Sequence, residues 1–237
     1  MAKRYLIVNA DDFGQGGGVN QGIIAAHERG IVTSASLMVR WHEADAAAAY
    51  AKDNPAFSVG LHVDLSEWAY RDDSWIPLYE VVPLDDPFGV EREIGHQLTA
   101  FRRLVGREPT HLDSHQHAHR DEPVRSIMQK LARDLGIPLR HFDRRIRYFG
   151  GFYGQDDTGS PYPDGVSVES LLRILERIEP GITELGCHPG LAIDFDTMYA
   201  TERSIEVRTL CDPRIRAAVM AQRIELCGFP SNAHRSG

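Results

Sequence analysis

The sequence predicts an α/β protein, a distorted β/α barrel with about seven parallel strands. Short apolar or β-branched runs alternate with helical patterns along the chain, and most of these runs end in polar, reactive residues. The carboxyl ends of barrel strands meet at one mouth, whereas an open sheet gathers its site at one switch point. Several strand ends with reactive side chains therefore favour the barrel.

The first part of the chain supplies four strand–helix units. The expected strands are 5–10, 32–39, 57–65 and 110–116, and the expected helices are 19–30, 43–53, 90–105 and 123–135. Apolar residues recur at helical spacing from Val19, and Gly30 ends that helix. Asn54–Pro55 stops the second helix, and Gly136 ends the fourth.

The second part of the chain continues the alternation. The expected strands are 138–142, 182–190 and 224–229, with a helix over 168–178 and a helical region over 204–223. Two stretches, 66–87 and 144–165, are predicted to be irregular and are rich in Tyr, Trp, Gly and Asp; long loops in compact domains are usually functional. Because no linker or shift in composition divides the chain, we expect one domain over residues 1–237.

The composition of the chain limits the kinds of partner that we expect it to bind. The chain has 26 Lys and Arg against 34 Asp and Glu, a net charge of −8, which argues against a nucleic-acid partner. No apolar stretch approaches the roughly 20 residues that span a bilayer, and Tyr5–Val8 is too short for a signal-peptide core. The three cysteines are odd in number and lack CxxC spacing. We therefore expect a cytoplasmic protein without disulfides or membrane contact.

Two adjacent aspartates, Asp11 and Asp12, end the first predicted strand. Neighbouring strand residues point to opposite faces, so the pair can serve one site only if the backbone turns, as Phe13–Gly14 allows. Like charges in a cleft repel, and a cation would relieve that repulsion. The alternative is a helix N-cap, which explains one aspartate but not both.

Histidines gather in "THLDSHQHAHR", residues 110–120, and His62 ends an earlier strand. Strand alternation would put four side chains on one face: Asp113, His115, His117 and His119. Imidazole and carboxylate are common ligands of divalent metals, so Asp12, His62 and His115 form a candidate metal triad. The other three would support the ligands or face the substrate. A solvated loop, or a core histidine at position 62, remains the alternative.

Two further residues are candidates for the site. His188 ends the strand in "ELGCHPG", where it is suited to donate a proton to a leaving group. Arg140 in "PLRHFD" can orient a carboxylate or contact the substrate. The alternatives are a structural histidine and a surface arginine.

Six ordered motifs resemble the YdjC-like carbohydrate deacetylase family, from Tyr5 to about Gly190. The motifs are "VNADDFG", "GIVTSASLMV", "GLHVDLSE", "PTHLDSHQHAH", "GIPLR" and "ELGCHPG". The family is distantly similar to polysaccharide deacetylases with a distorted β/α barrel. The resemblance implies hydrolysis of the N-acetyl group of an acetylated amino sugar, often a short chito-oligosaccharide.

The resemblance also implies the site roles. Asp12, His62 and His115 match the metal ligands, Asp11 the general base, and His188 the general acid. The implied metal is Mg²⁺, although two imidazoles and a carboxylate suit Zn²⁺ equally well. Trp68 stands where relatives often have glycine, which bears on substrate preference, and a homodimer is the family-level expectation.

Two rival hypotheses remain open from the sequence. A metal-independent glycosidase would use paired carboxylates such as Asp11 and Asp64, which need about 5–10 Å of separation across a sugar. A non-catalytic metal- or sugar-binding protein would need no base or acid. The first leaves the histidines unexplained, and the second leaves the base and acid candidates unexplained.

Overall fold

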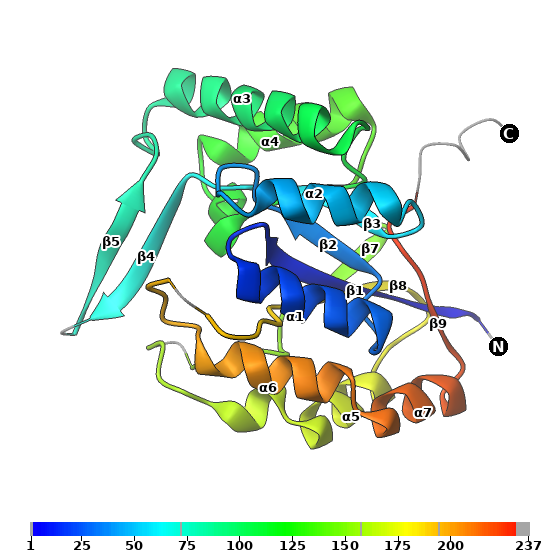
Figure 1. Cartoon of the computed structure of the whole chain (residues 1–237). Helices are drawn as coiled ribbons and strands as arrows, with labels where there is room; N and C mark the ends of the chain where they lie inside the picture. Colours follow the sequence, from blue (N-terminus) through cyan, green and yellow to red (C-terminus); the bar gives the residue numbers. More distant parts are fainter. Residues whose placement is uncertain (1, 72, 157, 194, 231–237) are drawn as a thin grey trace, which may run out of the picture.

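The computed structural model describes residues 2–71, 73–156, 158–193 and 195–230. Its main sheet consists of β1 (Arg4–Phe13), β2 (Ser34–Leu37), β3 (Ser58–Val63), β6 (Leu112–Ser114), β7 (Ile146–Phe149), β8 (Gly181–Cys187) and β9 (Ile224–Leu226). The order is β6-β3-β2-β1-β8-β7, with β9 also paired to β1, and every pairing is parallel (Figure 1). The sheet curls into a half-barrel, which confirms the predicted fold class.

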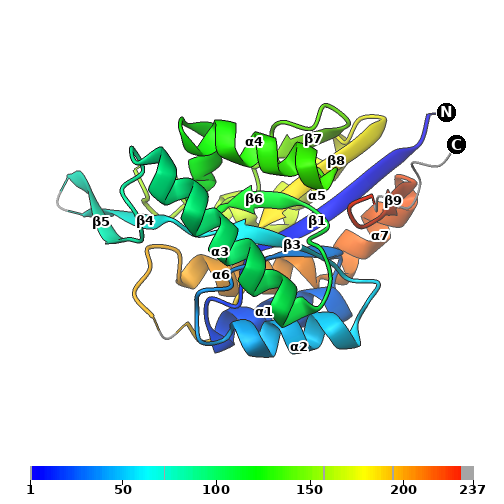
Figure 2. The same cartoon turned by 90° about the horizontal axis from the view of Figure 1, so that it is seen from above.

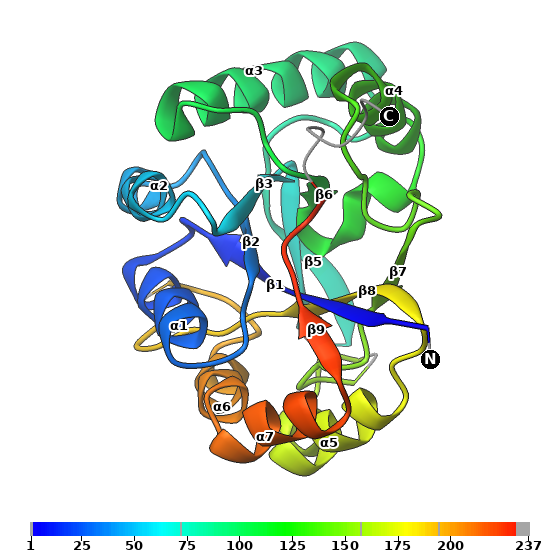
Figure 3. The same ribbon diagram turned by 90° about the vertical axis from the view of Figure 1, so that its right-hand side faces the viewer.

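Helices surround this sheet (Figure 3). They are α1 (Gly17–Glu28), α2 (Ala44–Asp53), α3 (Pro87–Val105), α4 (Val124–Leu135), α5 (Val168–Glu176), α6 (Thr201–Leu210) and α7 (Pro213–Ala221), with short 3₁₀ turns η1 (His115–Arg120) and η2 (Pro163–Val166). Among the described helices, none has both the length and the hydropathy of a membrane span.

The central strand β1 is buried from Leu6 to Phe13. A parallel strand covered by helices on its outer face and by the curled sheet on its inner face needs apolar residues on both sides, so it has no polar alternation. Four of its side chains, those of Leu6, Val8, Ala10 and Phe13, join one large hydrophobic cluster with residues from the surrounding helices, α1 and α3 among them. The polar end of β1 is thereby fixed within the sheet.

Three predictions of local structure were wrong. The stretch 66–87, expected to be irregular, contains an antiparallel hairpin of β4 (Ser66–Arg71) and β5 (Ser74–Glu80), which projects at the carboxyl end of the sheet (Figures 1 and 2). The stretch 144–165 contains β7. Conversely, the expected strand 138–142 makes only an isolated bridge at Leu139, because His141 adopts a left-handed φ of 68° that turns the chain.

Candidate active site

Asp11 and Asp12 close β1 at the carboxyl end of the sheet. Asp12 has a φ of 67°, and the pairing of β1 with β2 shifts register between Ala10 and Phe13. The backbone therefore turns at Asp12 itself, before the expected position, and both carboxylates line the same pocket. Both are buried, with 3% and 1% of their surfaces exposed.

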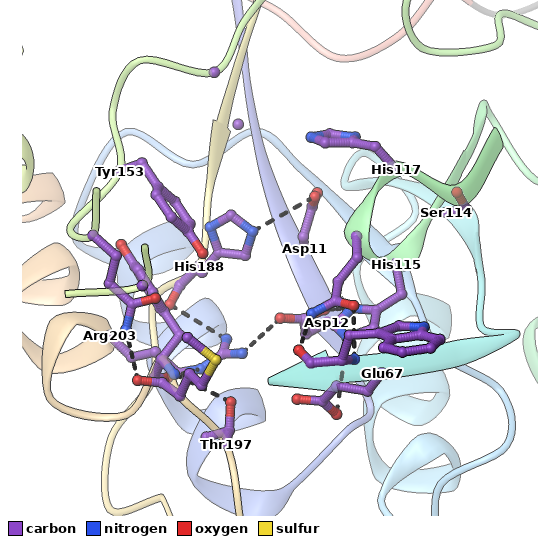
Figure 4. A pocket seen from close by; sticks show the side chains of 18 of the residues that line it. Asp11, Asp12, Glu67, Ser114, His115, His117, Tyr153, His188, Thr197 and Arg203 are labelled. Atoms are coloured by element: carbon purple, nitrogen blue, oxygen red, sulfur yellow. Dashed lines mark hydrogen bonds and ion pairs between the residues drawn. The ribbon is translucent and has the colours of Figure 1, made fainter. Parts of the chain in front are cut away.

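Asp12 faces histidines from two other elements. Its Oδ1 lies 3.0 Å from Nδ1 of His115, in η1, and 3.4 Å from Nε2 of His62, in β3. The three residues offer ligand atoms within 4.8 Å of one another. The chain thus brings together the three residues that the sequence proposes as metal ligands, from positions 12, 62 and 115. Figure 4 shows Asp12 and His115 side by side in the pocket.

The surroundings of these three residues suit a bound cation. Nδ1 of His62 donates to Oδ1 of Asp113 at 2.8 Å, which leaves Nε2 directed toward Asp12. Burial lowers the pKa of His62, but Asp113 and Asp12 outweigh it and raise the pKa to about 10. The site thus favours a positive charge. Nε2 of His115 is buried without a hydrogen-bond partner, 3.9 Å from Glu67 of β4.

Asp11 is held by Arg140. The two guanidinium nitrogens donate to both carboxylate oxygens, at 2.6 and 2.8 Å, and Asn9 adds a third donor at 2.8 Å. Burial would raise the pKa of Asp11, but Arg140 outweighs it and the pKa falls below its usual value. Asp11 is therefore an ionised carboxylate in a fixed orientation, as a base requires.

His188 lies on the other side of the pocket from His115 of η1 (Figure 4). Its Nε2 is 3.9 Å from Oδ2 of Asp11, and its backbone N–H donates to Glu206. Burial lowers the pKa of His188 to about 4, and the nearby aspartates offset this only in part. The imidazole is therefore neutral at pH 7 in the resting site.

The pocket between these groups has a volume of about 400 Å³. Its lining includes Trp68 and Trp75 from the hairpin, together with Tyr148 and Tyr153. Side chains of this kind cover an apolar ligand face, while the polar groups at the base can fix its orientation. The pocket therefore suits a small, partly polar ring.

A family model described as "YdjC-like protein" matches residues 5–221. The chain belongs to the YdjC-like family. The resemblance stated from the motifs is confirmed.

Curated relatives align over nearly the whole chain. A carbohydrate deacetylase of Geobacillus stearothermophilus is 33% identical, over 95% of this chain and 97% of its own. A chitooligosaccharide deacetylase of Klebsiella pneumoniae is 33% identical, over 92% of this chain and 94% of its own.

Solved structures share the fold. A putative cellobiose-phosphate cleavage protein of Enterococcus faecalis has a TM-score of 0.74 at 24% identity and covers 96% of this chain and 98% of its own. A family 4 carbohydrate esterase of Streptomyces lividans, solved with acetate, has a TM-score of 0.57 at 14% identity. It covers 96% of this chain and 93% of its own.

The histidines of η1 do not share one face, so the alternation predicted for this YdjC-like chain was wrong. β6 ends at Ser114, and Gln116 and His117 adopt left-handed φ values of 47° and 55°. His117 lines the pocket, whereas His119 lies behind it with Nδ1 2.6 Å from Oγ of Ser114. A strand pattern predicts the wrong neighbours here because the backbone is no longer extended.

Of the remaining predicted residues, one lines the pocket and the others lie outside its lining. Asp113 and Arg140 lie behind the pocket, where Arg140 contacts Asp113 at 2.8 Å as well as Asp11. Trp68 lies at the pocket, and its backbone N–H and carbonyl both bond the side chain of Gln116, at 2.9 and 2.8 Å. Asp64, the second carboxylate of the glycosidase hypothesis, is outside the pocket lining and bonded by Arg40, Trp41 and Tyr79.

Sequence reasoning missed four buried charged residues in this YdjC-like site: Glu67, Glu184, Arg203 and Glu206. Arg203 donates to Oδ2 of Asp12 at 2.6 Å, and Glu184 accepts from Arg140 at 2.7 Å. Glu184 interrupts an apolar strand, which is a signal that the sequence contains. Arg203 and Glu206 lie on a helix with little amphipathic pattern, where a solvent-facing surface is the default interpretation.

Proposed function

We propose that this YdjC-like protein is a metal-dependent hydrolase that removes the N-acetyl group from an acetylated amino sugar or short chito-oligosaccharide. The names of its relatives support the substrate class. One observation carries the proposal: the Asp12, His62 and His115 group and the Asp11–His188 pair line the same pocket. A hydrolase needs both a position for the reacting carbonyl and groups that move protons beside it.

Asp12, His62 and His115 would hold the metal, and Asp113 would orient His62 through the bond to Nδ1. A bound divalent cation would polarise the acetyl carbonyl and make water more acidic. We propose Mg²⁺, with Zn²⁺ as the alternative that the nitrogen donors favour.

In the proposed reaction, Asp11 accepts the proton of the attacking water. Water oxygen bonds to the carbonyl carbon, the C–N bond then breaks, and acetate and a free amine result. Arg140 keeps Asp11 ionised and directed by two hydrogen bonds, so the base needs no rearrangement.

His188 is proposed to protonate the leaving amine. Because His188 is neutral in the resting site, it must first gain a proton during the cycle. Asp11 is the nearest source, since its Oδ2 lies 3.9 Å from Nε2 of His188, and this proton is the one that water has released. Glu206 fixes the backbone of His188.

The test is a product balance on a chito-oligosaccharide series, after metal analysis of the purified protein. We expect acetate and free amine in equal amounts, no new reducing ends, and loss of turnover with chelator that returns when metal is added. Reducing ends without acetate would support the glycosidase instead. No turnover on any N-acetylated sugar would support a binding protein.

A further inference from the structure

A second group of histidines lies next to the pocket, and the proposed reaction does not use it. His117 and His119 come from η1, and His141 follows the bridge that Leu139 makes with Leu112. Each offers a ring nitrogen, and these three atoms lie within 4.8 Å of one another. We call these residues the histidine trio. None of them belongs to the Asp12, His62 and His115 group.

Two of the buried nitrogens in the histidine trio have no hydrogen-bond partner. The His119 side chain is fully buried, and its Nδ1 bonds Oγ of Ser114 at 2.6 Å while its Nε2 has no partner. Nδ1 of His117 is likewise unpartnered. Buried polar atoms are nearly always paired in folded proteins, so two such atoms in one cluster indicate a missing partner.

Aromatic packing explains part of this arrangement but not the unpaired nitrogens. The ring centroids of His117 and His141 are 5.1 Å apart, and that of Tyr148 lies 4.6 Å from His141. Edge-on contacts of this kind stabilise apolar rings equally well. A phenylalanine would give the same packing without burying a nitrogen. Three histidines together therefore need a partner that accepts nitrogen ligands.

The donor set determines the kind of ion. Three imidazoles without a carboxylate suit borderline metals such as Zn²⁺, whereas Mg²⁺ requires oxygen ligands. The bond between Nδ1 of His119 and Ser114 is the type of support that a metal-binding histidine has, because it fixes the ring and leaves Nε2 free. The nearby charge of Arg140 is balanced by Asp11, Asp113 and Glu184.

We propose that His117, His119 and His141 form a second metal site, which takes Zn²⁺ or a similar borderline cation and excludes Mg²⁺. A metal there would join η1 to the segment that follows Leu139, next to the wall of the pocket. The inference is independent of the deacetylase reaction, since it concerns residues outside the proposed catalytic group.

The experiment counts zinc per chain. Metal-free full-length protein is dialysed against Zn²⁺, and bound metal is quantified by mass spectrometry for the wild type and the His62→Gln, His141→Gln and double variants. His141 is exposed, so its replacement should leave the fold intact, which circular dichroism checks. His62 belongs to β3 and is not a member of the trio, so His62→Gln leaves the three trio side chains in place. His96→Gln, an exposed histidine of α3, is the matched control.

We expect two zinc ions in the wild type and in His96→Gln, one in each single variant of the two sites, and none in the double variant. In His62→Gln, Mg²⁺ should not bind, and Zn²⁺ should raise the melting temperature only while His141 is present. Equal zinc in His62→Gln and the double variant would overturn the second site. If His141→Gln loses a zinc ion but His62→Gln does not, the second site is supported and the proposed catalytic metal site is contradicted.

Discussion

At the residue scale, each of the two adjacent aspartates has its own arginine. Arg140 pairs with Asp11 and Arg203 pairs with Asp12, both at 2.6 Å, and all four side chains are buried. The repulsion that the sequence suggests is therefore relieved by the protein itself. The argument for a metal rests instead on Oδ1 of Asp12, which faces two histidines, and on the unpartnered nitrogen of His115.

Asp11→Asn tests the base. An amide keeps the size and the bond from Asn9 but cannot accept the proton of water, so we expect kcat to fall by about 10²–10⁴-fold. Metal content should stay at the wild-type level, because Asp11 is not among the proposed ligands. Asp53→Asn, an exposed change in α2, is the control for the loss of one charge. Turnover close to that of the wild type would exclude Asp11 as the base.

At the scale of elements, the end of β8 is positioned by α1. Leu191 donates its backbone N–H to the carbonyl of Gly18 at 2.8 Å, and a Cβ at Gly22 would lie 2.4 Å from Cα of Gly190. The glycines at positions 18 and 22 therefore permit close packing of α1 against the turn after β8. That turn begins just after His188, so this contact helps to fix His188.

Gly22→Ala should thus affect both stability and activity. The added methyl group must displace the Gly190 backbone, and we expect a loss of about 1–3 kcal/mol in the free energy of unfolding. Gly17→Ala is the matched control in the same helix, since its nearest neighbours are 3.7 Å away or more and alanine favours helix by up to about 1 kcal/mol. Urea unfolding gives the stability of each variant, and steady-state kinetics give its kcat. Equal stabilities for the two variants would contradict the close contact.

The β4–β5 hairpin contributes to the pocket through Trp75, which is 51% exposed and lines it. Trp75→Ala should raise KM for chito-oligosaccharides about fivefold, the equivalent of about 1 kcal/mol of lost ring contact. Phe88→Ala removes an aromatic ring that is 81% exposed and outside the pocket lining, and it should leave KM unchanged. A similar KM for both variants would show that the hairpin does not bind the substrate.

At the scale of the whole molecule, buried acids make stability depend on pH. Burial, with Asp113 and Asp11, raises the pKa of Glu184 to about 7, although Arg140 opposes this. The folded protein therefore binds this proton more tightly than the unfolded chain, whose value is near 4.5. The contribution of Glu184 to the free energy of unfolding is greatest below pH 4.5 and falls as the pH rises through 7.

Glu184→Gln removes this ionisation while keeping an acceptor for Arg140. We expect the variant to lose less stability than the wild type between about pH 5 and about pH 8, by at most about 3 kcal/mol. Urea unfolding at both pH values gives the change in stability with pH for the wild type and for the variant. Parallel curves for the wild type and the variant would show that Glu184 does not titrate in this range.

The sequence by itself determined the alternation of strands and helices, the parallel half-barrel and the residues of the candidate triad. Apolar periodicity and reactive strand ends are local features that can be read along the chain, and parallel strands bring those ends to one edge. The resemblance to the family also implied roles for the residues at these ends, and those roles stay predictions.

Only the tertiary structure decided the partners of those residues. Arg203 of α6 meets Asp12 across 191 positions, and His141 joins the histidines of η1 because a left-handed residue turns the chain away from β6. Local sequence pattern cannot predict such pairs, because burial and charge balance arise only when distant elements pack together. The hairpin at 66–80 was missed for the same reason, since its stability depends on the surface that it covers.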